Sequence, residues 1–245
     1  MAALLDVRNV SKRFGGLRAV KDVSFTMSEG EILFIIGPNG AGKTTVFNLI
    51  SGFLHPDEGS ITFGSQEISR MAPHRIARLG IGRTFQIVKP LPNLSVLENV
   101  MLGSFMHHAS PIRAAEDAGT ILDFLQMSHL AKSQARGLPL AALKRLEIAR
   151  ALATRPRLIL LDEVVSGLTT GEALALADLL KRLSEWGVSV VGGVEHVMQV
   201  VMKIADRVVV LDYGAKIAEG VPAEIVKQPQ VIEAYLGPKY KELTQ

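Results

Sequence analysis

The sequence predicts an α/β fold with a mixed central sheet, an N-terminal antiparallel β layer and an inserted helical lobe. An apolar strand pattern over residues 31–36 leads directly into a glycine-rich turn and a helix pattern. Strand and helix patterns alternate again from Leu158 onward, which is typical of parallel strands joined by crossover helices. Between these regions, from about Val88 to Gly137, apolar residues recur at helical spacing.

The N-terminal half is expected to begin with the antiparallel layer. Apolar and polar residues alternate over 4–10 and 17–27, which indicates two half-buried strands with Phe14 in the turn between them. The buried strand over 31–36 follows. The other expected elements of this half are helices over 43–51 and 73–79 and strands over 60–63 and 81–85.

The helical lobe is predicted from two apolar stripes, formed by Val96, Leu97, Val100 and Met101 and by Ile121, Leu122 and Leu125. After it we expect strands from 158 and over 188–194, 208–211 and 216–218, helices over 171–185 and 196–205, and two short helices from 222 to 237. The chain is therefore predicted to be one domain, residues 1–245, with the lobe at about 88–155 and a helical tail at about 222–245.

Composition narrows the class of protein. With 245 residues, 48% hydrophobic and 21% charged, the chain is globular, and it lacks cysteine, so disulfides and thiolate metal sites are excluded. A net charge of +3 and 5% aromatic residues give no support for nucleic-acid binding. We expect a solvated helix face and its exit at Arg70, Arg75, Arg78 and Arg83. No apolar run approaches the ~20 residues of a spanning helix, and no secretory signal is present. We expect a protein in the cytosol or on the cytoplasmic face of a membrane.

The strongest motif is the phosphate-binding loop that follows the strand over 31–36. It fits the spacing G-x-x-x-x-G-K-[ST], in which glycines turn backbone N–H groups toward phosphates and the next helix points its positive end at them. Lys43 would reach the β and γ oxygens, and Thr44 would ligate magnesium. A plain glycine-rich turn is disfavoured because lysine and a hydroxyl follow the last glycine. The candidate nucleotide-binding residues are Gly37, Pro38, Asn39, Gly40, Ala41, Gly42, Lys43, Thr44 and Thr45.

A second candidate cluster is the acid pair Asp162 and Glu163, directly after the apolar strand that starts at Leu158. Ligands of open α/β sheets collect at the carboxyl ends of the strands. Asp162 would hold magnesium through water, and Glu163 would orient or deprotonate an attacking water. Alone, such a pair would more often be a solvated strand end. Together with the phosphate-binding loop it indicates hydrolysis of a nucleoside triphosphate.

These motifs, in this order, resemble an ATP-binding cassette (ABC) protein, a P-loop NTPase cassette, over essentially the whole chain. Several phrases further resemble the ATPase subunits of branched-chain amino acid uptake systems. They are Phe14-Gly-Gly-Leu-Arg-Ala-Val20, Gly82-Arg-Thr-Phe-Gln86, Leu94-Ser-Val-Leu-Glu-Asn-Val100 and Val231-Ile-Glu-Ala-Tyr-Leu-Gly237.

The resemblance implies further site residues. Phe14 would stack on adenine, with an apolar plug between strands as the alternative. Gln86 would touch magnesium or the attacking water, although a single glutamine proves little. His196 would bond the γ-phosphate, whereas taken alone it could be an ordinary core histidine. Glu163, Gln86 and His196 form the expected catalytic set. ATP and Mg²⁺ are the expected cofactors.

Two segments depart from the family pattern. Leu138-Pro-Leu-Ala-Ala142 stands where family members carry the Leu-Ser-Gly-Gly-Gln signature that caps the γ-phosphate held by the opposite subunit of a dimer. Pro139 supplies neither a hydroxyl nor a backbone N–H. Thr169 stands where the family usually has an aspartate that communicates across the dimer. We therefore expect a heterodimer with a second cassette of intact signature. A homodimer in which the altered signature still works stays open.

The resemblance implies an ATPase that drives an importer of branched-chain or related amino acids. The implied partners are two transmembrane permease subunits, a second ABC ATPase and an extracytoplasmic solute-binding protein. Two alternatives remain: a soluble cassette ATPase that acts on ribosomes or DNA, which would usually carry fused cassettes or long arms, and a subunit in which ATP only switches association.

Overall fold

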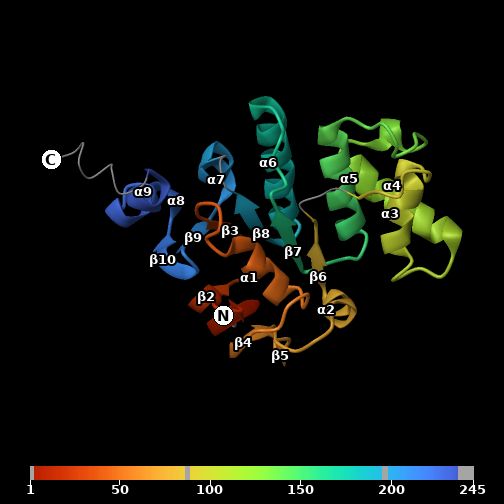
Figure 1. Ribbon diagram of the computed structural model, residues 1–245. Helices are drawn as coiled ribbons and strands as arrows, with labels where there is room; N and C mark the ends of the chain where they lie inside the picture. Colours follow the sequence, from red (N-terminus) through yellow and green to blue (C-terminus); the bar gives the residue numbers. More distant parts are fainter. Residues whose placement is uncertain (1–2, 86–88, 195–197, 237–245) are drawn as a thin grey trace.

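Two sheets of different character form within residues 3–85, 89–194 and 198–236, the part of the chain that the computed structural model describes (Figure 1). One is a four-stranded antiparallel sheet with the order β2-β1-β4-β5. The other is a mixed six-stranded sheet with the order β10-β9-β3-β8-β7-β6. The predicted fold class, a mixed central sheet beside an N-terminal antiparallel layer, is confirmed.

The antiparallel sheet consists of β1 (Leu5–Phe14), β2 (Leu17–Met27), β4 (Glu58–Phe63) and the short β5 (Gln66–Glu67). The expectation that Phe14 lies in a turn is wrong. Phe14 is the last residue of β1 and pairs with Leu17, so the turn is Gly15 and Gly16 alone. Gly15 has a φ of 57°, and such a glycine pair supplies the left-handed backbone that a two-residue hairpin needs.

The central sheet is built around β3 (Ile32–Ile36), which runs parallel to β8 (Ser189–Val194) and β9 (Arg207–Asp212). Beyond β8 lie β7 (Leu158–Asp162) and β6 (Ile81–Arg83), also parallel, and β10 (Ala215–Gly220) pairs antiparallel with β9. Every residue of β3 and β7 is buried, as expected for strands covered on both faces. Their carboxyl ends therefore meet at one edge of the sheet.

Strand β3 contributes to both hydrophobic cores. Leu33 and Ile35 belong to the core that also contains the antiparallel sheet and α1 (Lys43–Ile50). Ile32, Phe34 and Ile36 belong to the core on the other face, which includes α6 (Thr170–Glu185) and α7 (Met198–Ile204). Successive side chains of a strand point to opposite faces, so five apolar residues can serve two cores.

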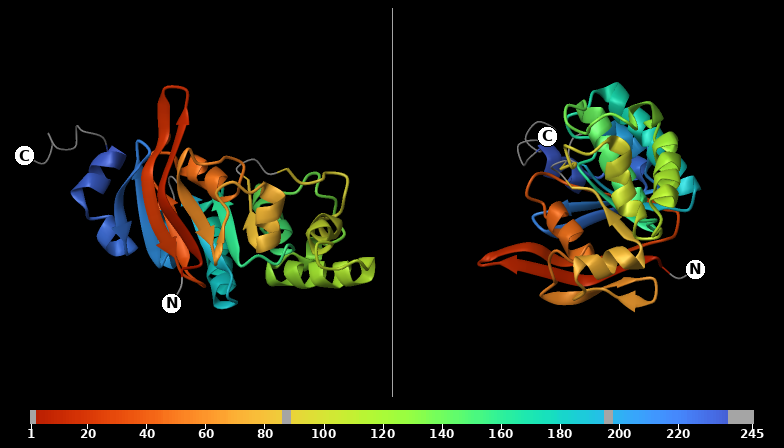
Figure 2. Two further views of the ribbon diagram at one scale, coloured as in Figure 1. Left: turned by 90° about the horizontal axis from the view of Figure 1, so that it is seen from below. Right: turned by 90° about the vertical axis from the view of Figure 1, so that its right-hand side faces the viewer.

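The helical lobe contains α3 (Val96–Ser104), α4 (Pro111–Phe124), the 3₁₀ turn η1 (Ser128–Leu130) and α5 (Leu140–Leu152). These helices gather at one side of the central sheet, near α2 (Pro73–Leu79) and β6, while α8 (Pro222–Ile225) and α9 (Pro229–Leu236) lie at the opposite end (Figures 1 and 2). The predicted stripes are buried at Val96, Val100, Leu122 and Leu125. Among the described helices, none is both long and apolar enough to cross a bilayer.

Candidate functional site

The phosphate-binding loop connects β3 to α1 and depends on its glycines. Gly37, Gly40 and Gly42 have φ values of 151°, 79° and 102°, a region that side chains rarely adopt. A Cβ on Gly42 would lie only 2.5 Å from the Ala19 carbonyl oxygen, so the loop needs glycine for space as well as for conformation. Gly42 is also the N-cap of α1 and brings no side chain to the cap. The first N–H groups of α1 thus stay available for an anion.

Lys43 lies at the centre of this loop. Its side chain is 6% exposed, and its ammonium group donates hydrogen bonds to the carbonyl oxygens of Gly37 at 2.7 Å and Pro38 at 2.9 Å. A buried ammonium folded back over the loop places a positive charge where phosphate oxygens would bind. The sequence predicts that Lys43 reaches the β and γ oxygens, and that role stays a prediction.

Asp162 and Glu163 lie at the end of β7, at the same sheet edge as the loop. Asp162 is 3% exposed and Glu163 is partly buried. Burial raises the pKa of the Asp162 carboxyl above its ordinary value, although the nearby Arg83 guanidinium acts in the opposite direction. Glu163 has a left-handed φ of 51°, and its backbone N–H donates to the Gly193 oxygen at 3.0 Å. This backbone turns the chain sharply at the strand end.

Thr44 and Asp162 both line a cavity of about 940 Å³ between the sheet and the lobe. A hydroxyl and a carboxylate are oxygen donors, which suit Mg²⁺ because that ion takes few protein ligands and completes its shell with phosphate oxygens and water. The residues present therefore fit the expected metal.

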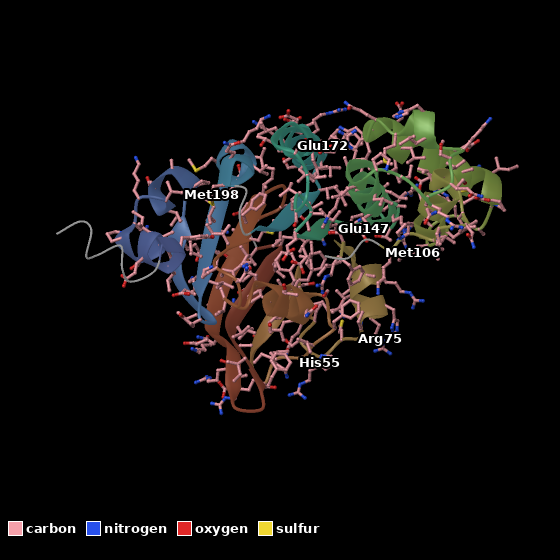
Figure 3. All side chains as sticks on the ribbon, turned by 45° about the horizontal axis from the view of Figure 1, so that its top comes forward. His55, Arg75, Met106, Glu147, Glu172 and Met198 are labelled. Carbon is pink, nitrogen blue, oxygen red and sulfur yellow. The ribbon has the colours of Figure 1, made fainter. Side chains whose placement is uncertain are left out.

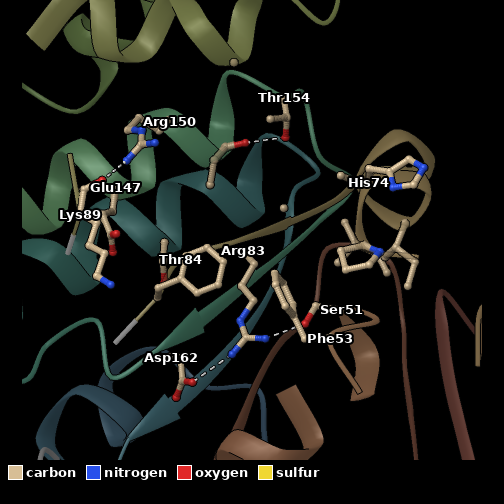
Figure 4. A pocket seen from close by; sticks show the side chains of 18 of the residues that line it. Ser51, Phe53, His74, Arg83, Thr84, Lys89, Glu147, Arg150, Thr154 and Asp162 are labelled. Carbon is tan, nitrogen blue, oxygen red and sulfur yellow. Dashed lines mark hydrogen bonds and ion pairs between the residues drawn. The ribbon is translucent and has the colours of Figure 1, made fainter. Parts of the chain in front are cut away.

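Arg83, on β6, was expected to be a solvated residue at the exit of a helix face, and that expectation is wrong because its side chain is only 8% exposed. Its guanidinium donates to Asn48 Oδ1 at 2.7 Å and Ser51 Oγ at 2.6 Å and lies 3.4 Å from Asp162 Oδ2 (Figure 4). The rings of Phe53 and Phe85 flank it, with centroids at 5.5 and 5.2 Å. Burial lowers the pKa of this guanidinium, and Asp162 partly offsets that effect. The hydrogen-bond partners of Arg83 lie at least 32 positions away in the sequence, so they were not foreseen.

Lys144 and Glu147 on α5 were also missed. The Lys144 ammonium donates to the Glu163 backbone oxygen at 3.0 Å. Glu147 lies between the lobe and the sheet (Figures 3 and 4). Its carboxylate accepts hydrogen bonds from the backbone N–H groups of Phe85 and Lys89. Burial lowers the pKa of the Lys144 ammonium, and nearby carboxylates act in the opposite direction. Burial raises the pKa of the Glu147 carboxyl, and its backbone hydrogen bonds and nearby cations act against that shift. The apolar pattern around them gave no sign of two buried charges.

A smaller cavity of about 380 Å³ adjoins the other side of the loop. Phe14 lines it with 45% of its surface exposed, and so does Tyr213, which is 80% exposed and has a φ of 43°. The structure thus brings Phe14 to the residues 40–45 of the loop, as the adenine role requires. Tyr213 lies between the strands expected over 208–211 and 216–218, and it was not singled out from the sequence. Gln86 and His196 lie outside the described residues.

The larger cavity extends from Asp162 toward the lobe. Its wall includes aromatic and aliphatic side chains, among them Phe53, Phe85, Leu102 and Met106, and charged side chains from Lys89 and Arg150 (Figure 4). Arg150 Nη1 also donates to the Lys89 backbone oxygen at 3.0 Å. Leu102, Phe105 and Met106 are each more than 40% exposed, which leaves an apolar rim on α3 and the turn that follows it.

The two departures from the expected pattern have structural consequences. Pro139 is the N-cap of α5 and makes no side-chain cap hydrogen bond. Leu140, the first residue of the helix, is 42% exposed and packs over Gly167. Thr169 caps α6 in a reciprocal capping box with Glu172. Thr169 thus stabilises the start of α6 within its own chain.

Known proteins share this sequence and architecture. A family model described as "ABC transporter" matches residues 20–166, and one described as "Branched-chain amino acid ATP-binding cassette transporter" matches residues 215–237. The chain is 38% identical to a probable branched-chain amino acid transport ATP-binding protein, LivG, of Archaeoglobus fulgidus, covering 98% of each chain. It is 39% identical to BraF, a high-affinity branched-chain amino acid transport ATP-binding protein of Pseudomonas aeruginosa, covering 96% of this chain and 98% of BraF. It also superimposes on an ATP-binding cassette of an ABC transporter solved in its ADP conformation, with a TM-score of 0.88, 34% identity and coverage of 97% and 100%.

Proposed function

Because the chain belongs to the ATP-binding cassette transporter family and is an ATPase of that family, we propose that it energises a membrane importer for branched-chain or related amino acids. Thr44 provides the main support, because it borders both the cavity that Phe14 lines and the larger cavity that reaches the lobe. A nucleotide in the smaller cavity and a partner protein in the larger one would therefore both lie next to Thr44. The relatives named for branched-chain amino acid transport support the solute class.

The residues of the site would act on ATP as follows. Phe14 stacks on adenine, and Lys43 with the loop N–H groups holds the β and γ oxygens. Thr44 and Asp162 would hold Mg²⁺, which would neutralise charge on the phosphates. Glu163 takes up a proton as the water oxygen bonds to the γ-phosphorus and the bond to the β–γ bridging oxygen breaks. The roles of Gln86, toward metal and water, and of His196, toward the γ-phosphate, rest on the family resemblance.

The larger cavity is the proposed docking site for the permease. Its apolar wall and its rim at Leu102, Phe105 and Met106 suit an amphipathic helix from a membrane subunit, and Lys89 and Arg150 offer charges to its polar side. The chain would then lie on the cytoplasmic face of the membrane, as a peripheral subunit of an assembly that contains two permease chains. A solute-binding protein on the other side would supply the solute.

We further propose that the second ATPase of the assembly is a different chain. Pro139 and the side chains of Leu140 and Ala141 occupy the segment that should approach the partner's γ-phosphate, and Pro139 has no N–H to donate. The residues of the chain's own ATP site keep the family pattern. A partner with an intact signature would complete this site, whereas this chain would complete the partner's site poorly.

Purification of the assembly through a tag on this chain tests these proposals. Two permease chains and a second cassette should copurify, and Glu163→Gln should remove most ATP hydrolysis. A homodimer that hydrolyses ATP cooperatively at a normal rate would refute the heterodimer proposal but not the importer proposal. Ribosomal companions, or an assembly that binds ATP but never hydrolyses it, would favour one of the two alternative classes and refute the importer.

A further inference from the structure

Helix α5 carries two buried charges that turn inward. Lys144 and Glu147 are 4% and 7% exposed and lie one turn apart on the helix. A buried charge is costly unless hydrogen bonds compensate it, so the partners of each show what it is used for. The partner of Lys144 lies at the proposed catalytic base, and the partners of Glu147 line the larger cavity.

Lys144 holds the backbone of the proposed catalytic base. Glu163 has the left-handed φ of 51°, which a residue with a side chain keeps only when its surroundings fix it. Its N–H donates to Gly193, and its carbonyl oxygen accepts from the Ser166 N–H at 3.1 Å and from Lys144 at 3.0 Å. Gly193 and Ser166 lie close to the turn itself, whereas Lys144 reaches it from the helical lobe.

Glu147 holds a second part of the site. Its carboxylate accepts from the N–H groups of Phe85 and Lys89, and Arg150, one turn further along α5, donates to the Lys89 oxygen. Phe85 and Lys89 both line the larger cavity. The same helix face therefore fixes the chain beside the proposed permease site and the chain beside the proposed base.

We infer that Lys144 and Glu147 are positioning residues through which α5 sets Glu163 and the backbone at Phe85 and at Lys89 of its own chain. This inference rests on the proposed role of Glu163. It gives the helix a use within the chain that is separate from the signature segment at its start. That segment departs from the family pattern, while the inward face of α5 carries two charges whose burial would be unfavourable without their partners.

Kinetics of the purified assembly test the Lys144 half. Lys144→Met should lower kcat roughly 10- to 100-fold, the effect expected for losing a charge-assisted hydrogen bond that sets the base. The KM and the bound nucleotide per chain should change less than about 2-fold, because Lys43 and the loop are untouched. Lys144→Arg should restore most of kcat. Lys203→Met is the matched control, since Lys203 is a helical lysine paired with Asp178 and 40% exposed.

The outcomes separate this inference from the proposed function. If Glu163→Gln abolishes hydrolysis and Lys144→Met leaves kcat within 2-fold of the parent, the inference fails and the ATPase site stands. If Glu163→Gln keeps full activity, the proposed base itself is wrong. A Lys144→Met assembly that loses kcat and bound nucleotide in parallel would show a merely structural lysine.

Hydrogen exchange tests the Glu147 half independently of turnover. Glu147→Gln keeps the shape of the side chain but replaces one acceptor oxygen by a donor. The amides of Phe85 and Lys89 should exchange at least about 10-fold faster, while the amide of Ser166 keeps its rate. In Lys144→Met the amide of Ser166 should exchange faster, while the amides of Phe85 and Lys89 keep their rates. Unchanged exchange at Phe85 and Lys89 would contradict the role of Glu147.

Discussion

Replacing Arg83 by methionine removes a guanidinium that joins three elements while keeping an apolar chain of similar length. In the parent protein this group bonds Asn48 and Ser51 of the loop-helix segment and faces Asp162 at 3.4 Å. Its side chain is 8% exposed and that of Asp162 is 4% exposed. The substitution would therefore leave a buried carboxylate without its nearest cation.

The expected loss is about 3 kcal/mol of unfolding free energy. Breaking a buried ion pair typically costs ~3–5 kcal/mol, and the 3.4 Å separation places this pair at the lower end. Ser51 keeps its own hydrogen bond to the Phe47 oxygen at 2.7 Å, so it is not left unsatisfied. Methionine still packs between Phe53 and Phe85 and retains part of the aromatic contact.

Urea denaturation followed by circular dichroism measures this loss, and the thermal midpoint should fall by ~6–12 °C in parallel. Arg157→Met is the matched control. Arg157 also lies over a phenyl ring, that of Phe63, and pairs with Glu29, but its side chain is 54% exposed. An exposed pair contributes less than about 1 kcal/mol. A loss for Arg83→Met no larger than that for Arg157→Met would refute the reasoning.

Three further outcomes are expected. Gly42→Ala should abolish ATP binding in calorimetric titration, because the φ of 102° and a backbone oxygen 2.5 Å from the new Cβ oppose a side chain. The control Gly119→Ala, in open space on α4, should leave ATP binding unchanged and be neutral or stabilising for the fold. Phe14→Ala should weaken ATP binding ~5-fold, which is about 1 kcal/mol, whereas Phe14→Tyr should keep it; equal affinities would remove Phe14 from the site. Hydrogen bonds from the backbone and hydroxyl of Thr169 hold the pKa of Glu172 below its ordinary value, so its stabilising effect is present above about pH 4.3 and is lost as pH falls through the lowered folded pKa. The difference in urea midpoint between the parent and Glu172→Gln should therefore shrink between pH 7 and pH 3, and a constant difference would contradict this.

Local signals explain what the sequence could predict. The loop 37–45, the strand before it and the apolar stripe at Val96 and Val100 are each encoded within a few neighbouring residues, and all lie where expected. The turn beside Phe14 was misplaced although Gly15 and Gly16 form a recognisable hairpin pair, because the alternation of polar residues was followed no further than Val10.

The rest of the site depends on contacts between distant segments. Arg83 meets Asp162 across 79 positions, and Lys144 meets Glu163 only because the lobe folds back onto β7. Arg83 and Lys144 each look like a surface charge in their own neighbourhood. Nothing within a window of ten or twenty residues indicates that a fold will bury either of them, so only the tertiary structure identifies their partners.

The sharing of β3 between two cores limits how the family can evolve. Ile35 packs in one core and Phe34 packs in the other. A change of side-chain volume at either position would disturb the packing on its own face. It would also shift the strand and so move the neighbouring residue in the other core. The phosphate-binding loop begins one residue beyond that strand. A substitution in the lobe or the tail should therefore disturb the loop less than a change of side-chain volume within β3.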